Sequence, residues 1–287
     1  MTRPTIALLG LLGLLALLPV AATTAFAQAP DDKPPPDQVI DLGGVTINRS
    51  KQFVEVQGHV ALDRGLVELF ACTPEGKAYE SILVLKCRAD MLQTGLLFLG
   101  LERGTSGRHA GDKIRTKGSP VVILATWTDP VTKTPVRRLA EDLVWDHRAS
   151  KPMKRVGWVF VGSRFATNPQ SQREVFMASV TGTLVVTYHD PDAILDTPHD
   201  AGIDDSTFYA NHYVLPPRGT ALVMRIYAQK AYEALPAAEQ AMPAPAAPAG
   251  DGAQVPPANG SGSDTGSPPE GPAVGSGSMP EGPDAHR

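Results

Sequence analysis

The sequence predicts a β-rich α+β domain with a mostly antiparallel sheet, arranged as a sandwich or a barrel, and one packed helix. Three observations predict this class. Several stretches rich in Val, Ile, Leu and aromatic residues either alternate between apolar and polar positions or are apolar throughout, as strands are. Turn residues, mainly Gly, Pro and Asp, separate these stretches. Only one segment has the apolar spacing of an amphipathic helix.

The first 27 residues predict export. Arg3 precedes an apolar run at 6–20, and the small residues Ala25 and Ala27 follow it. This order is typical of a secretory signal peptide, 1–27, that is cleaved after its last alanine. The apolar run is short for a membrane anchor, and no basic cluster follows it. We therefore expect an exported, periplasmic or extracellular protein with no membrane span after cleavage.

The rest of the chain divides by composition into three parts. A Pro-rich linker, 28–37, leads into a single predicted domain, 38–235. Residues 236–287 are rich in Pro, Gly, Ala and Ser, and they carry too little apolar surface to offset the entropy of ordering, so we expect a disordered tail. The predicted domain has 23 Lys and Arg residues against 21 Asp and Glu. This near-neutral balance argues against nucleic acid as a partner.

The first three strands are predicted to form an antiparallel meander. Residues 52–62 alternate between an apolar and a polar face, whereas 66–72 are apolar on both faces, which is typical of a central strand. A third strand is predicted at 78–85. The short turn Asp63–Gly65 joins the first pair, and the turn Thr73–Lys77, with Pro74 and Gly76, joins the second pair.

One helix is predicted, at 90–100, and further strands follow it. Asp90 can cap the helix at its N-terminus and Gly100 can end it. Five residues form its predicted buried stripe: Met91, Leu92, Gly95, Leu96 and Leu99. The later strand-like stretches lie at 120–129, 136–146, 157–165, 174–190 and 219–228.

An acid pair is predicted within the second hairpin. If residues 74–76 form a three-residue loop, Glu68 and Glu80 become diagonal neighbours about 7–8 Å apart, on the same face as Cys72. Two carboxylates on such a face can share a proton or bind a ligand. The alternative is that Lys77 or another base neutralises them at the rim of the sheet.

The same register bears on the two cysteines of the chain. It places Cys72 and Cys87 roughly 30 Å apart along the sheet, beyond the reach of a disulfide. A bridge would need the chain to leave the hairpin after Ser81. Two thiols are too few for an iron–sulfur cluster or for a thiolate zinc site of the usual kind. We therefore expect no cofactor, apart from a candidate divalent metal.

The candidate metal site is the stretch "HDPDAILDTPHDAGIDD" at 189–205. Its candidate ligands are Asp190, Asp192 and Asp196, which His189 and His199 could join. The calcium-loop pattern fails here, because apolar residues occupy inner positions and no glutamate closes the loop. The alternative interpretation is a set of turns and caps, since Asp-Pro and Thr-Pro pairs are strong turn signals.

Six stretches of the predicted domain resemble the bacterial YdjY-like family. They are "KQFVEVQGHVALDRGLVELFACTPEGKAYES", "GLLFLGLERG", "EDLVWD", "GWVFVGSRF", "HDPDAILDTP" and "LPPRGT", spread over 51–227. The resemblance implies an exported, envelope-associated protein without an assigned activity. The positions that match the family pattern are Glu68, Cys72, Lys77, Glu80, Trp158, Asp190 and Asp196, and no catalytic role comes with them. Some members carry names that suggest a ferredoxin-like cluster, for which this chain lacks the cysteines.

Three functions remain open at this point. The first is an exported, non-catalytic envelope protein that binds an unknown protein or envelope partner through its β-rich core. It is favoured because the sequence holds no GxSxG, HExxH, GxGxxG or P-loop motif. The second is a metal- or small-ligand-binding module that uses the Asp-rich loop. The third is a hydrolase-like enzyme that uses the acid pair.

Overall fold

A computed structural model of the chain describes residues 39–243. The predicted signal peptide, the Pro-rich linker and all but the first eight residues of the predicted tail lie outside the described residues. Within them, the fold is β-rich with few helices, as predicted from the sequence. No helix in this part of the chain has both the length and the apolar character needed to cross a membrane.

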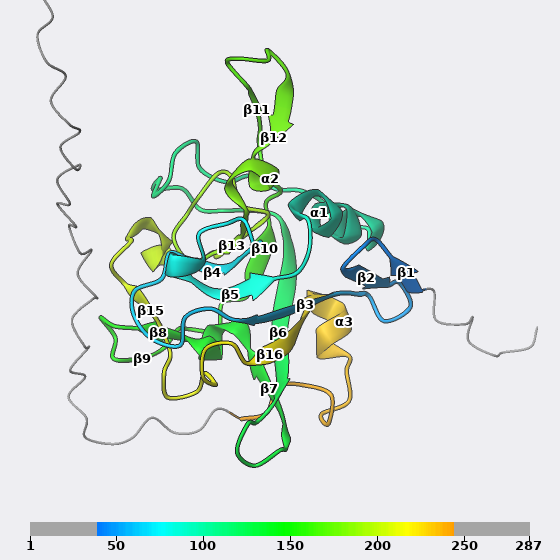
Figure 1. Ribbon diagram of the computed structural model, residues 1–287, viewed down its shortest axis with the longest axis vertical. Coiled ribbons are helices and arrows are strands. Elements are labelled where there is room, and N and C mark those ends of the chain that lie inside the picture. Colours follow the sequence, from blue (N-terminus) through cyan, green and yellow to red (C-terminus); the bar gives the residue numbers. More distant parts are fainter. Residues whose placement is uncertain (1–38, 244–287) are drawn as a thin grey trace, which may run out of the picture. The chain divides into compact units, whose positions relative to one another are not determined.

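Eight strands of the described chain form a closed ring, so the fold is a barrel (Figure 1). In ring order they are β3 (Phe53–Val60), β16 (Ala221–Ala228), β6 (Ser119–Thr128), β10 (Trp158–Phe160), β14 (Leu195–Asp196), β13 (Thr183–Val186), β4 (Leu69–Cys72) and β5 (Ser81–Leu85). The β3–β5 pairing closes the ring. Six of these pairings are antiparallel, and β13–β14 and β4–β5 are parallel.

The remaining strands extend or flank the barrel. They are β1 (Val39–Asp41) and β2 (Val45–Asn48) beside β3; β7 (Pro135–Leu139) beside β6; a small sheet of β8 (Val144–Asp146), β9 (Lys151–Pro152) and β15 (Phe208–Ala210); and the hairpin of β11 (Phe165–Thr167) and β12 (Glu174–Phe176). Figure 1 shows that hairpin projecting from the barrel. Short helices join several strands: η1 (Ala78–Glu80), η2 (Ala140–Leu143), α2 (Met177–Thr181) and η3 (Asp200–Ile203). A further short helix, α3 (Gln229–Glu233), follows the last strand.

The alternation predicted for the first strand is confirmed in β3. Val54, Val56 and Val60 are buried, whereas Gln57 between them is exposed. Gly58 also lies on the buried face, where a Cβ atom would be only 2.4 Å from the carbonyl oxygen of Val84 in β5. A glycine is therefore needed where β3 and β5 meet to close the barrel.

The predicted antiparallel hairpin at 66–85 is wrong. β4 and β5 are parallel, with Leu69 opposite Ser81 and Cys72 opposite Val84. The turn after Cys72 continues into η1, in which the Glu80 amide donates to the Lys77 carbonyl. The chain therefore returns to the start of β4 before β5 begins, instead of reversing directly. The other neighbours are β13 for β4 and β3 for β5.

The predicted helix is α1 (Ala89–Phe98), and it begins one residue earlier than expected. Arg88 occupies the N-cap position and Asp90 lies in the first turn, so the prediction that Asp90 caps the helix is wrong. Gly100 follows the helix with a φ of +78°, as a terminating glycine does. Leu92, Gly95, Leu96 and Leu99 of the predicted stripe are buried, and Met91 packs against the same core at half burial.

Both cysteines are free and buried. Burial raises the pKa of the Cys87 thiol to about 12 and also raises that of Cys72. The Ser81 side chain hydrogen-bonds to Cys72 and partly opposes the rise. Because the thiolate is the reactive form, burial disfavours reaction of both thiols near neutral pH. They serve as small apolar groups of the core.

Candidate functional site

The Asp-rich stretch of the sequence lies after β13 and runs through β14 to η3. A second segment, 104–117, packs on it. The Gly111 amide donates to the His189 carbonyl at 2.8 Å, and the Thr116 hydroxyl donates to the Thr197 carbonyl at 3.1 Å. Two loops that are more than 70 residues apart in sequence therefore form one surface.

A buried histidine–aspartate pair is at the centre of this surface. His189 Nδ1 lies 2.9 Å from Asp196 Oδ1, and the two residues are 2% and 0% exposed. The Thr197 amide donates to the same Oδ1 at 2.7 Å, and the Ser106 hydroxyl donates to Oδ2 at 3.2 Å. Burial raises the pKa of the Asp196 carboxyl, and the bond to His189 opposes the rise.

These contacts fix the orientation of the imidazole. An ionised Asp196 accepts from both neighbours, which places a proton on His189 Nδ1 and turns Nε2 away from the carboxylate. Within the described residues, Nε2 has no hydrogen-bond partner. On one side of the ring, Gly202 of η3 packs so closely that a Cβ atom there would lie 2.6 Å from His189 Cε1. The missing side chain of Gly202 therefore makes room for the ring.

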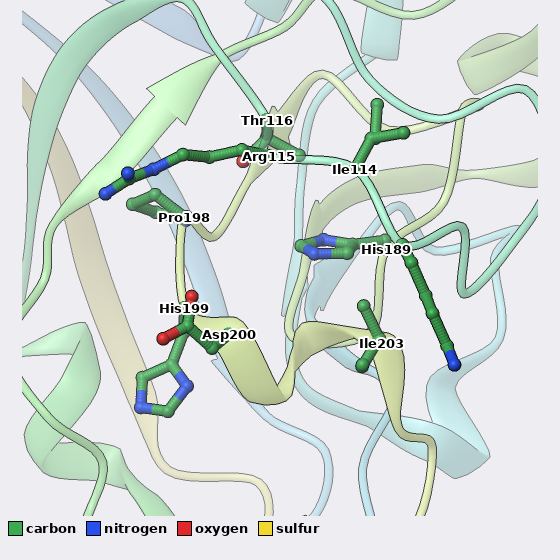
Figure 2. Close-up of a pocket in the computed structure, with 9 residues that line it drawn as sticks. Ile114, Arg115, Thr116, His189, Pro198, His199, Asp200 and Ile203 are labelled. Carbon is green, nitrogen blue, oxygen red and sulfur yellow. The ribbon is translucent and has the colours of Figure 1, made fainter.

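The imidazole faces a pocket of about 280 Å³, which we call the His189 pocket (Figure 2). Its lining residues are Lys113, Ile114, Arg115, Thr116, His189, Pro198, His199, Asp200 and Ile203. Figure 2 shows the His189 ring between Ile114 and Ile203 and directed toward Pro198. The volume is at the small end of the range for ligand sites, which suits a small molecule or a single chemical group of a larger one.

The positive and negative side chains that line the His189 pocket do not balance. Lys113 and Arg115 are exposed, and within the described residues neither makes a hydrogen bond or an ion pair through its side chain. His199 accepts a hydrogen bond at Nδ1 from the Ala201 amide at 3.0 Å, and burial lowers its pKa, so it is neutral near pH 7. Asp200 is the one acid of the lining. The pocket therefore carries an excess of positive charge.

The three predicted metal ligands take three different partners. Asp190 accepts from the Asp192 amide at 2.8 Å and so forms a turn, whereas Asp192 forms an ion pair with Arg164 at 2.6 Å. Asp196 is the buried partner of His189. Among the described residues, no group of three or more His, Cys, Asp or Glu side chains is placed to hold a metal ion.

The predicted acid pair does come together, although by a different route from the predicted hairpin. The Glu68 amide donates to the Glu80 carbonyl at 3.2 Å. Lys77 Nζ lies 2.7 Å from Glu80 Oε1, so this lysine neutralises one member of the pair. Burial and the nearby Glu80 charge raise the pKa of Glu68, and Lys77 opposes them. Cys72, predicted to share this face, is fully buried nearby.

Sequence reasoning found part of the His189 pocket and missed the rest. The Asp-rich stretch and its two histidines drew attention by composition, whereas Lys113 and Arg115 lie in a loop without any motif. Trp158, which matches the family pattern, is a core residue that packs against Phe70 with ring centres 5.6 Å apart. No sequence signal linked the two loops, because the bonds that join them are tertiary.

Among known proteins, the chain is similar to one family of protein domains. The chain matches no curated protein and no solved structure. The family model of the YdjY domain matches residues 45–227, which is more than half of the chain and includes all of the barrel strands except the last residue of β16. The resemblance seen in the sequence is thus confirmed, and the chain belongs to the YdjY domain family.

Proposed function

We propose that the protein is an exported envelope domain that binds a small ligand in the His189 pocket and does not transform it chemically. One observation carries the proposal: a buried imidazole, held at Nδ1 by buried Asp196, presents Nε2 to a pocket. A buried polar group of fixed orientation in a partly apolar pocket is how binding sites orient ligands. The exposed rim accepts a free ligand or one carried by an envelope partner.

The arrangement around His189 supports binding over catalysis. In a Ser-His-Asp triad the serine hydroxyl bonds to the imidazole, which then takes its proton. Here the Ser106 hydroxyl bonds to Asp196 instead, on the side away from the free Nε2. The acid pair is a weaker alternative, because Lys77 neutralises Glu80 and neither glutamate lines the His189 pocket.

A ligand screen with a blocked variant tests the proposal. The chain from Gln28 onward is screened against small molecules of all charge types by a thermal-shift assay. We expect Ile203→Trp, which fills the His189 pocket, to abolish the shift caused by true ligands. Val131→Trp is the control, since Val131 is an exposed residue of the β6–β7 loop. Ligands that bind both variants equally would show that the pocket is not the site.

Export is tested separately. The proposal is supported by the apolar run and the small residues before Gln28. We expect the whole chain, expressed in a Gram-negative bacterium, to appear in the periplasmic fraction with Gln28 as its first residue by mass spectrometry. Ala27→Leu should block the cleavage, because the peptidase requires a small residue there. An uncleaved chain in the cytosol would contradict export.

A further inference from the structure

The charge and shape of the His189 pocket indicate which class of ligand it takes. We propose that the pocket binds a small organic anion, whose carboxylate or phosphate group contacts His189 Nε2 and Arg115 and whose apolar part lies against Ile114 and Ile203. This inference rests on the proposed function, because it names the ligand of the same site. Three steps lead to this class of ligand: the unpaired cations, the buried donor and the apolar wall.

The first step is the pair of cations without partners. Other arginines that contact the Asp-rich loop are neutralised: Arg164 pairs with Asp192, and Arg148 pairs with Asp204. Lys113 and Arg115 have no such partner within the described residues, yet both line the pocket. Figure 2 shows the Arg115 side chain extending beside and past Pro198. A guanidinium binds carboxylate and phosphate groups through two parallel hydrogen bonds.

The second step is the buried donor. With Nδ1 bonded to Asp196, His189 has Nε2 directed into the pocket, where this nitrogen can hold a proton between the ring and an anion. The negative charge of Asp196 lies behind the ring, where Thr197 and Ser106 already bond to it. An anion bound at Nε2 therefore shares a proton with a ring whose own carboxylate partner is buried out of the anion's reach. Charge-assisted hydrogen bonds of this kind are the strong ones.

The third step is the apolar wall. Ile114 and Ile203 are large apolar residues that remain 40% and 38% exposed, and both line the pocket. Together with Pro198 they offer a surface to a short hydrocarbon chain. An inorganic anion would use only the charged side of the pocket, whereas an organic anion uses both sides. A volume of about 280 Å³ suits a molecule of a few carbon atoms.

Matched ligands test the charge requirement. The chain 28–287 is titrated with butyrate, with inorganic phosphate and with the neutral analogue butyramide, and binding is followed by amide chemical shifts. We expect butyrate to bind about tenfold or more tightly than butyramide, and more tightly than inorganic phosphate, which has no apolar part to place against Ile114 and Ile203. Tighter binding of inorganic phosphate than of butyrate would show that the apolar wall takes no part, and it would overturn the inference of an organic anion. Equal binding of butyrate and butyramide would overturn the inference.

Matched variants test the residues. Arg115→Gln should weaken anion binding about tenfold and leave butyramide unchanged, because only the charge is lost. Arg49→Gln removes the same charge from an exposed turn outside the pocket and should change neither. Anion binding that survives both Arg115→Gln and Ile203→Trp would overturn the inference. If neutral ligands bind and Ile203→Trp blocks them, the proposed function stands and only the anion inference fails.

Discussion

Carboxyl groups of this protein differ in how well their burial is compensated. Asp196 is fully buried, and three donors satisfy its two oxygen atoms. Glu141 is also buried, but only Oε1 has a partner, the Gly157 amide, while Oε2 has none within the described residues. Burial raises the pKa of both. The burial of Asp196 is therefore compensated by hydrogen bonds, one of them with the His189 ring, whereas the burial of Glu141 is compensated only in part.

Glu68 gives the clearest pH-dependent prediction. Its pKa in the folded chain is raised, by burial first and then by Glu80, so the folded state holds this proton more tightly than the unfolded state. Stability from this group is thus full below about pH 4.3, the ordinary glutamate pKa, and is lost as the pH rises through the raised value. Glu68→Gln should therefore raise the melting temperature at pH 7.5 but not at pH 4.

The control for this prediction is Glu75→Gln, in the exposed turn after β4. It removes the same charge without removing a buried carboxyl, so the change in melting temperature should be small at both pH values. A Glu68→Gln variant that melts lower than the natural chain at pH 7.5 would contradict the prediction. That result would mean that Lys77 contributes more than burial and Glu80 together.

At the scale of elements, the β3–β5 pairing decides whether the sheet closes. Only three residue pairs form it, Gly58–Leu85, His59–Val84 and Val60–Leu83. The two backbones approach so closely at Gly58 that a Cβ atom would be 2.4 Å from the Val84 carbonyl oxygen. A short pairing with one such contact cannot spread the strain of a larger side chain over many residues.

Gly58→Val should therefore destabilise the barrel. We expect a loss of about 1–3 kcal/mol in the free energy of unfolding, the usual cost of overpacking, measured by urea denaturation. Gln57→Val, at the exposed neighbouring position of the same strand, should change it by about 0.5 kcal/mol or less. Equal stability of the two variants would show that the backbones separate at little cost.

The loop between β13 and η3 gives a prediction about metal ions. Because Asp190, Asp192 and Asp196 bond to different partners, a metal would have to break an ion pair or a buried bond to gather them. We therefore expect the same melting temperature in EDTA and in millimolar Ca²⁺, Mg²⁺ or Mn²⁺. An ion-dependent rise that disappears in the double variant Asp190→Ala/Asp192→Ala would restore the metal-loop interpretation.

For the whole molecule, the sequence predicts those features that depend on residues close together in the chain. The alternation in β3 and the buried stripe of α1 are repeated within a few residues, so both elements could be predicted. The direction of β5 relative to β4 could not, because both strands are apolar on each face and either pairing buries them. The same holds for the site. His189 could be predicted because it belongs to a stretch with an unusual composition, whereas Arg115 could not, because tertiary bonds alone bring its loop to the pocket.

The C-terminal end of the packed molecule also depends on tertiary bonds. The sequence predicts a domain that ends at Leu235, where the Pro-rich composition begins. In the structure, chain contacts continue: Arg137 of β7 donates to the Ala238 carbonyl at 2.6 Å, and the Met242 amide donates to the Arg137 carbonyl at 3.0 Å. The Ala241 amide donates to the Tyr232 hydroxyl at 2.9 Å. This segment bonds to the free edge of β7.

A chain shortened to Leu235 should therefore be less stable than one that ends at Pro243. Five hydrogen bonds to the rest of the chain are lost, and at the low end of about 0.5–1.5 kcal/mol for each bond they predict a loss of about 3 kcal/mol. For about 200 residues this lowers the melting temperature by roughly 5–10 °C. Extending the chain from Pro243 to Arg287 should add no stability, because that composition offers little apolar surface for burial. Equal melting temperatures for the two shortened chains would contradict this prediction. They would show that residues 236–243 add no stability at the edge of β7 and that the folded domain ends at Leu235, as the sequence predicts.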